Sequence, residues 1–368
     1  MSIFKKTLSC AVLAALSTCA LAGCGKQETA GETQPAETET AVSETLSADA
    51  STPYGQHGAL HVENGKLTDE HGNAIQLYGM STHGIAWFPQ YINYDSFRTL
   101  RDDWNTNCIR LAMYTAEYGG YCAGGDKEQL KQLVKDGVSY ATELGMYVIV
   151  DWHILSDCDP NQNKDEAIAF FREMSEAFAD NDNVLYEICN EPNGGTSWDS
   201  IKSYAEEVIP VIRAQKSDAV ILVGTPTWSQ EIDKAAAAPL DDSNVMYTLH
   251  FYAGTHKDDL RSRLETCAQN GLPVFVSEFG MCDASGNGAN DFDSTTKWLD
   301  LLNKYQISFC CWNLANKDES SSVFKASSTA LSGWTDDDFN ESGRWIRDYF
   351  RGMPQNSHLT SFYNNSSS

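Results

Sequence analysis

Two glutamates stand at the ends of short apolar segments of the chain. Glu191 follows the segment 184–189 and precedes Pro192, which has no N–H with which to continue a β-ladder. Glu278 directly follows a second such segment, 273–277. Both segments are rich in β-formers and too short for a stable helix. Two carboxyl groups at strand ends can divide the work of cleaving a glycosidic bond, because one donates a proton and the other attacks the sugar or activates water.

The segments that carry these glutamates belong to a regular alternation of strand-like and helix-like stretches. Strands are expected near 75–81, 107–112, 146–152, 184–189, 220–224, 245–250, 273–277 and 309–312, with helices near 94–104, 127–144, 164–179, 198–215, 229–238, 257–270, 292–305 and 340–351. Eight such pairs predict an α/β fold, the (β/α)8 TIM barrel. A doubly wound sheet is the rival, but no glycine-rich turn follows the first strand. Turn signals within 60–76 predict a short N-terminal hairpin that closes the bottom of the barrel.

Polar and aromatic side chains follow the expected strands. In chain order they are His83, Trp87, Arg110, Tyr114, His153, Asn190, Glu191, Trp228, His250, Tyr252, Glu278, Trp312, Lys317 and Glu319. Because the carboxyl ends of barrel strands meet on one rim, we expect these residues to form one site. The loop 157–165 lacks the glycine and the closing glutamate of a calcium loop, and no zinc-binding HExxH motif is present, so we expect no metal and no cofactor.

Six motifs together resemble glycoside hydrolase family 5, in the order and on the strands that this family uses. They are Ile109-Arg110, Asp151-Trp152-His153, Asn190-Glu191-Pro192, His250-Phe251-Tyr252, Ser277-Glu278-Phe279-Gly280 and Trp312. Stretches 81–87, 224–230 and 316–321 are similar to the bacterial endoglucanases of its second subfamily. The resemblance implies a retaining endo-β-1,4-glucanase that acts on cellulose-type chains. A β-mannanase or mixed-linkage β-glucanase of the same family stays open, because loop contacts decide the substrate.

The resemblance also implies a role for each residue of the rim. Glu191 would be the proton donor and then the base, and Glu278 the nucleophile. Arg110 and Tyr252 would be partners of that nucleophile, Asn190 would bond the sugar 2-OH, and His153 and His250 would orient groups around the sugar and the acid. The substrate contacts would be His83, Trp87, Tyr114, Trp228, Trp312, Lys317 and Glu319. A non-catalytic glycan-binding lipoprotein is the alternative of another class, although a binder has no use for the paired carboxylates.

The N-terminus has the charge, apolar and small-residue order of a secretory signal. It ends in Leu21-Ala22-Gly23-Cys24, which resembles a bacterial lipobox. We therefore expect a signal peptide at 1–23, lipidation of Cys24 and a disordered acidic, Thr-rich tether over 24–53. The catalytic domain is expected over 54–356 and a flexible tail over 357–368. This organisation predicts an exported protein that is anchored at the cell surface or extracellular.

Composition limits the partners of the chain. The formal net charge of −25 argues against nucleic acid, and against membrane contact other than through the N-terminal lipid. A neutral β-1,4-glucan or oligosaccharide is compatible with this charge, and we expect a monomer. Eleven cysteines leave eight after residue 24. Their pairing cannot be chosen from sequence, although Cys122 and Cys158 would lie on neighbouring loops and form one candidate disulfide.

Overall fold

The computed structural model describes residues 49–354. The predicted signal peptide, Cys24, the tether up to residue 48 and the predicted tail 357–368 lie outside the described residues. Within 49–354, no helix is both long and apolar enough to cross a lipid bilayer.

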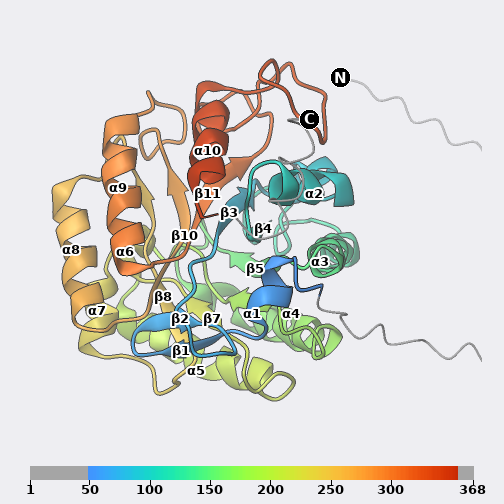
Figure 1. Ribbon diagram of the computed structural model, residues 1–368. Coiled ribbons are helices and arrows are strands. Elements are labelled where there is room, and N and C mark those ends of the chain that lie inside the picture. Colours follow the sequence, from blue (N-terminus) through green and yellow to red (C-terminus); the bar gives the residue numbers. More distant parts are fainter. Residues whose placement is uncertain (1–48, 355–368) are drawn as a thin grey trace, which may run out of the picture. The chain divides into compact units, whose positions relative to one another are not determined.

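Eight parallel strands of the described chain close into a barrel (Figure 1). They are β3 Tyr78–Thr82, β4 Cys108–Tyr114, β5 Tyr147–His153, β6 Val184–Glu187, β7 Ile221–Val223, β8 Val245–Thr248, β10 Val274–Gly280 and β11 Phe309–Leu314. Consecutive strands pair in parallel, and β11 pairs with β3 to complete the ring. A two-residue strand, β9 (Phe251–Tyr252), pairs alongside β10. The predicted TIM barrel is confirmed.

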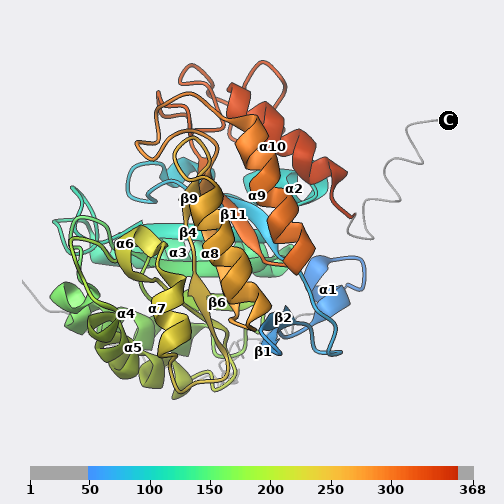
Figure 2. The same cartoon turned by 90° about the vertical axis from the view of Figure 1, so that its left-hand side faces the viewer.

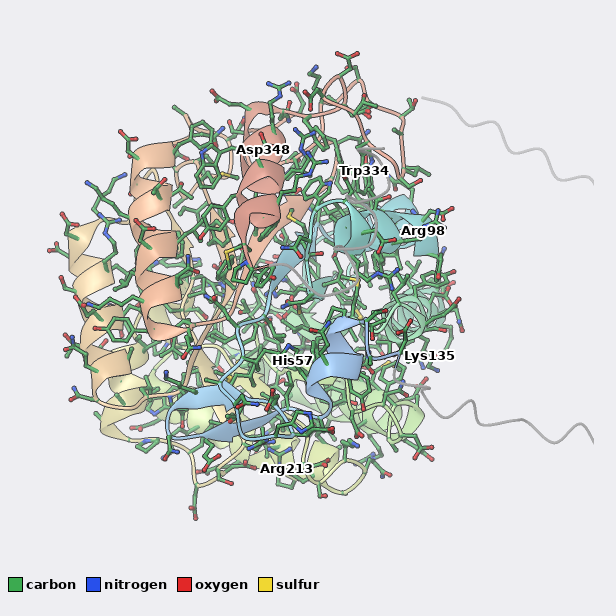
Figure 3. The ribbon with its side chains drawn as sticks, in the orientation of Figure 1. His57, Arg98, Lys135, Arg213, Trp334 and Asp348 are labelled. Atoms are coloured by element: carbon green, nitrogen blue, oxygen red, sulfur yellow. The ribbon has the colours of Figure 1, made fainter. Side chains whose placement is uncertain are left out.

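The helices lie outside the strands (Figure 1, Figure 2). The eight that sequence periodicity predicts are α2 Tyr94–Asp102, α3 Lys127–Glu143, α4 Lys164–Ala177, α5 Trp198–Arg213, α7 Ile232–Ala237, α8 Asp258–Gln269, α9 Phe292–Tyr305 and α10 Glu341–Gly352. Helix α3 begins where the Asp126 side chain accepts two backbone N–H groups, and it buries a stripe of apolar residues at three- and four-residue spacing. Lys135 and Arg213, labelled in Figure 3, bind carboxylates on the outer surface. Such exposed pairs contribute little to stability.

The N-terminal elements close the bottom of the barrel, as the turn signals predict. Strands β1 (His61–Glu63) and β2 (Lys66–Thr68) form an antiparallel hairpin. Apolar residues of this region join an apolar layer inside the barrel, which consists of Leu60, Leu67, Ile75, Leu77, Cys108, Tyr147, Ile149, Leu185, Val220, Leu222, Met246, Phe275 and Cys310. A short helix, α1 (Pro53–His57), was not predicted. It begins inside the proposed tether because Thr52 caps it and Pro53 supplies a preset φ.

A second layer of side chains lies above the apolar layer, and we call it the polar layer. It contains Arg110, Asp151, Glu187 and Ser277, each two residues after a member of the apolar layer. Because side chains on a strand alternate, residues two apart point to the same face. All four polar-layer residues have no exposed surface. The barrel therefore carries charged groups in its interior, directly beneath its carboxyl rim.

Two expectations are corrected. The predicted helix 229–238 begins only at Ile232, because residues 227–229 within α6 (Pro226–Ser229) have φ angles of 58°, 53° and 54°. The candidate disulfide does not form, since both thiols are free. The thiol of Cys158 instead approaches the carbonyl of Ser156 at 3.4 Å, and Cys122 packs against the main apolar core.

Candidate active site

A cavity of about 680 Å³ opens at the carboxyl ends of the strands. Of the predicted site residues, twelve line it: His83, Trp87, Tyr114, His153, Glu191, Trp228, His250, Tyr252, Glu278, Trp312, Lys317 and Glu319. Arg110 and Asn190 lie beneath it with no exposed surface. Other residues that line the cavity were not expected from the sequence, among them Glu117, Leu155, Gln230, His256 and the loop 284–286. These residues come from loops, where periodicity carries no signal.

Glu278, near the end of β10, is held by two donors. The Tyr252 hydroxyl donates to Oε1 at 2.8 Å, and Nη1 of Arg110 donates to Oε2 at 3.1 Å. Burial alone would raise the pKa of this carboxyl, but the positive charges of His250 and Arg110 hold the pKa below its ordinary value. Glu278 is therefore ionised near neutral pH, as a nucleophile requires.

The Arg110 guanidinium is bonded on every nitrogen. Nε donates to Glu187 Oε2 at 2.7 Å, and Nη2 lies 2.6 Å from Asn190 Oδ1 and 3.0 Å from Asp151 Oδ2. With Glu278 on Nη1, three carboxylates and an amide surround one cation. Because this group has no exposed surface, it acts on the carboxylates of the site and does not reach a ligand in the cavity.

Glu191 lies in the loop that follows β6, and this loop is tied down by hydrogen bonds. The amide of Asn193 donates to the carbonyls of Leu155 and Glu191, and the Ser229 hydroxyl donates to the carbonyl of Asn190. The loop thereby places a Glu191 carboxylate oxygen within 4.8 Å of one from Glu278. Burial, followed by the negative charge of Glu278, raises the pKa of Glu191, so this carboxyl retains its proton to higher pH than its neighbour.

His153 is a neutral imidazole between Asp151 and Asn190. Its Nδ1 lies 2.6 Å from Asp151 Oδ2, and its Nε2 lies 3.3 Å from Asn190 Nδ2. Burial lowers the pKa of His153 to about 3. Asn190 Nδ2 also donates to the Ile154 carbonyl at 3.1 Å, so both amide hydrogens have partners. A bond from Asn190 to a sugar hydroxyl must therefore replace the longer contact with His153.

Aromatic rings and an ion pair surround the carboxylates. Trp87 and Trp228 are 37% and 46% exposed, whereas Trp312 is buried at the base. At one end of the cavity Lys317 Nζ lies 2.6 Å from Glu319 Oε2, and His83 Nε2 lies 3.6 Å from Glu319 Oε1. Burial opposes ionisation of Glu319, but these two partners lower its pKa to about 2. The cavity thus combines flat apolar faces with fixed charges, which is the composition of a sugar site.

One group in the described chain has the residue types of a metal site: Glu191, His250 and Glu278, with ligand-type atoms within 4.8 Å of one another. Both nitrogens of His250 are engaged, since Nδ1 contacts Glu191 at 3.0 Å and Nε2 contacts Ser277 Oγ at 2.9 Å. No lone pair of the imidazole is left for a cation. We therefore assign no metal to this trio.

Three polar-layer residues were not expected at the site: Glu187 was not singled out from the sequence, and Asp151 and Ser277 stood only inside motifs. A signal for them was present, because each is a polar residue that stands two positions after an apolar residue pointing into the barrel, on the same face of its strand. In a buried strand such a residue needs a partner.

A barrel whose carboxyl rim holds two closely spaced glutamates with opposite pKa shifts belongs to the class of glycoside hydrolases. The family model "Cellulase (glycosyl hydrolase family 5)" matches residues 68–318. The chain belongs to this family.

Relatives and solved structures agree with this assignment. The chain is 49% identical over 295 residues to Endoglucanase A of Butyrivibrio fibrisolvens, covering 79% of this chain and 68% of the relative. It is 48% identical over 301 residues to an endoglucanase of Clostridium saccharobutylicum, covering 81% and 66%. The chain thus spans about two thirds of the length of these relatives. The catalytic domain of a Thermobifida fusca endoglucanase, solved alone and as a variant with cellotetraose, matches with a TM-score of 0.78 and 42% identity over 82% of this chain and 99% of that chain.

Proposed function

We infer that this protein is an endo-β-1,4-glucanase that cleaves internal bonds of cellulose-type glucans with retention of configuration. The observation that carries this proposal is that one carboxylate oxygen of Glu191 lies within 4.8 Å of one carboxylate oxygen of Glu278, while the pKa of Glu191 is raised and the pKa of Glu278 is lowered. Retaining enzymes hold their carboxyl groups about 5–5.5 Å apart, whereas inverting enzymes leave about 6.5–9.5 Å for a water molecule. The separation therefore favours double displacement.

In the first step, a Glu278 carboxylate oxygen attacks the anomeric carbon while Glu191 gives its proton to the departing glycosidic oxygen. The C–O bond to the leaving sugar breaks and an ester between the sugar and Glu278 forms. Arg110 and Tyr252 keep the nucleophile ionised and oriented, because each donates to one of its oxygens. In the second step Glu191, now a carboxylate, takes a proton from water, and that water displaces Glu278.

The aromatic residues supply the binding surface for the chain. Trp312 lies at the base of the cavity beside the carboxylates, and Trp87 and Trp228 present exposed faces farther out. Apolar faces of sugar rings stack on such side chains. Tyr114 packs between Trp87 and His153, at centroid distances of 4.7 and 4.2 Å. His83, Lys317 and Glu319 offer hydrogen-bond partners at one end. The cellotetraose complex of the Thermobifida relative supports a glucan in this position.

The test compares two substrates for Glu191→Ala. An activated aryl leaving group departs without receiving a proton, so the variant should keep the parental rate of the first step on such a glycoside. The rate of hydrolysis of soluble β-1,4-glucan should fall by about 10²–10⁴-fold. Glu173→Ala, which removes a surface carboxylate on α4, is the control and should leave both rates unchanged. Equal losses on both substrates in the first step would refute the acid role. Parallel assays on mannan, xylan and mixed-linkage glucan decide between the glucanase and its alternatives.

We also propose that the enzyme is exported, carries a lipid on Cys24 after removal of residues 1–23, reaches its substrate on a tether, and works as a monomer without metal or cofactor. The order of charged, apolar and small residues at the N-terminus supports export.

A further inference from the structure

A continuous chain of hydrogen bonds joins the acid/base to the polar layer of the barrel. Glu191 Oε1 lies 3.0 Å from Nδ1 of His250, and Nε2 of the same ring lies 2.9 Å from Ser277 Oγ. The Ser277 hydroxyl donates to Glu187 Oε1 at 2.7 Å, and Glu187 Oε2 accepts Nε of Arg110 at 2.7 Å. Each of these side chains is buried. Glu187 itself does not line the cavity, so it cannot touch a sugar.

The directions of these bonds determine where the protons lie on His250. Burial opposes the charge on Glu187, but Arg110 lowers its pKa to about 2, so Glu187 is ionised and can only accept. Ser277 gives its one hydroxyl proton to Glu187, which leaves a lone pair of Oγ to accept from Nε2–H of His250. Nε2 therefore carries a proton, and Nδ1 is the nitrogen that shares a proton with Glu191.

We propose that Glu187 is a positioning residue which, through Ser277, keeps Nε2 of His250 protonated and holds the ring as an imidazolium beside Glu191. This arrangement sets the pH above which Glu191 can no longer donate a proton. The inference deepens the proposed function and rests on it for its kinetic consequence, although the protonation of His250 can be observed without substrate.

The charges around His250 support this arrangement. The groups that act on the ring come from β5, β6, the loop after β6 and β10, and they are Asp151, Glu187, Glu191, Ser277 and Glu278. Arg110 and Tyr252 lie one contact farther away, on Glu187 and Glu278. Burial alone would lower the pKa of His250, but its contacts with Glu187 and Glu191 raise it to about 9. The ring therefore stays cationic through neutral pH. A cation next to Glu191 favours the carboxylate, so loss of that charge should let Glu191 keep its proton to higher pH.

The first test is Ser277→Ala, which breaks the link and leaves the ion pair between Glu187 and Arg110 intact. The alkaline limb of the kcat/KM profile on soluble β-glucan should move to higher pH, because Glu191 beside a less charged ring keeps its proton to higher pH. Ser175→Ala is the matched control, because Ser175 is also buried and its hydroxyl donates to the Phe171 carbonyl on α4 at 2.6 Å. The control should leave the limb where it is. An unmoved limb in Ser277→Ala would overturn the proposal.

The second test asks whether Glu187 acts through Ser277. Glu187→Gln keeps the shape and removes the charge, so it should move the alkaline limb in the same direction, and the double variant should move it no further than the larger single shift. Additive shifts would mean that the two residues act separately and would refute the relay. Nitrogen NMR titration of the substrate-free enzyme should show His250 cationic in the parent at neutral pH and losing its charge at lower pH in Ser277→Ala than in the parent. A neutral ring in the parent would also refute it. A cationic ring in an enzyme that fails to cleave glucan would support the relay and overturn the glucanase assignment.

Discussion

Removing one hydroxyl at the nucleophile tests the electrostatics of the site most directly. Tyr252→Phe deletes the 2.8 Å bond to Glu278 Oε1 and keeps the ring, which packs over Gly280. A hydrogen bond to an ionised group contributes about 1.5–3 kcal/mol. Its loss destabilises the carboxylate form of Glu278, whose pKa should rise from its depressed value, and the acidic limb of kcat/KM should move to higher pH. On that limb only the ionised fraction reacts, so kcat/KM should fall by roughly 10- to 150-fold at about 1.36 kcal/mol per tenfold. Above the shifted limb the loss should be smaller.

The assay is initial-rate hydrolysis of soluble β-1,4-glucan across the whole pH range, together with thermal unfolding to show that the variant folds. Tyr204→Phe is the control, since this buried tyrosine on α5 donates to the Ile188 carbonyl at 2.7 Å and lies outside the cavity. It should keep the parental pH profile. A loss for Tyr252→Phe that is equal at every pH, with an unmoved acidic limb, would refute the role given to the hydroxyl.

Three further outcomes are expected. Arg110→Lys keeps the positive charge but loses the planar guanidinium whose N–H groups bind several acceptors, so kcat should fall by about 10²-fold with little change in KM. A large rise in KM instead would mean that Arg110 binds sugar. Trp228→Ala removes an exposed ring, and KM for long glucans should rise by about 5- to 50-fold, as measured on a ladder of oligosaccharides, while an unchanged KM would exclude stacking. Cys24→Ser should release active enzyme or leave an unprocessed precursor, as judged by membrane fractionation; lipid labelling equal to that of the parent would contradict the anchor.

The barrel and most of the site could be predicted from the sequence because both depend on local patterns. Each strand is a short apolar run, and a polar group at its end falls on the rim whatever the details of packing. The family resemblance implied Glu278 as a partner of Arg110, but Asp151 and Glu187 could not be predicted as partners, since they come from β5 and β6 and only the closed barrel brings them to the same guanidinium. The alternation of side chains along a strand predicts which face of the sheet a residue lies on, but it does not predict which residue it contacts across the barrel interior.

The positive φ angles of residues 227–229 are a second feature that local sequence patterns could not predict. Threonine and tryptophan rarely adopt positive φ, so propensity predicts an ordinary helix start. Distant contacts hold the left-handed turns, because Trp228 N–H donates to the Pro192 carbonyl and His250 N–H donates to the Ser229 carbonyl. The first bond ties the loop that carries Trp228 to the loop that carries Glu191, and the second ties it to the segment after β8 that carries His250.

The polar layer has a consequence for how this enzyme can evolve. Buried charges surrounded by apolar neighbours contribute little net stability, and apolar replacements of similar volume often fold better. A library of variants selected only for heat resistance would therefore gain substitutions at Arg110, Asp151 and Glu187 and would lose turnover as it improved. Selection for glucan cleavage as well as heat resistance would remove variants with these apolar substitutions. Thermostable descendants should then carry their gains in the outer helices and at the hairpin end of the barrel.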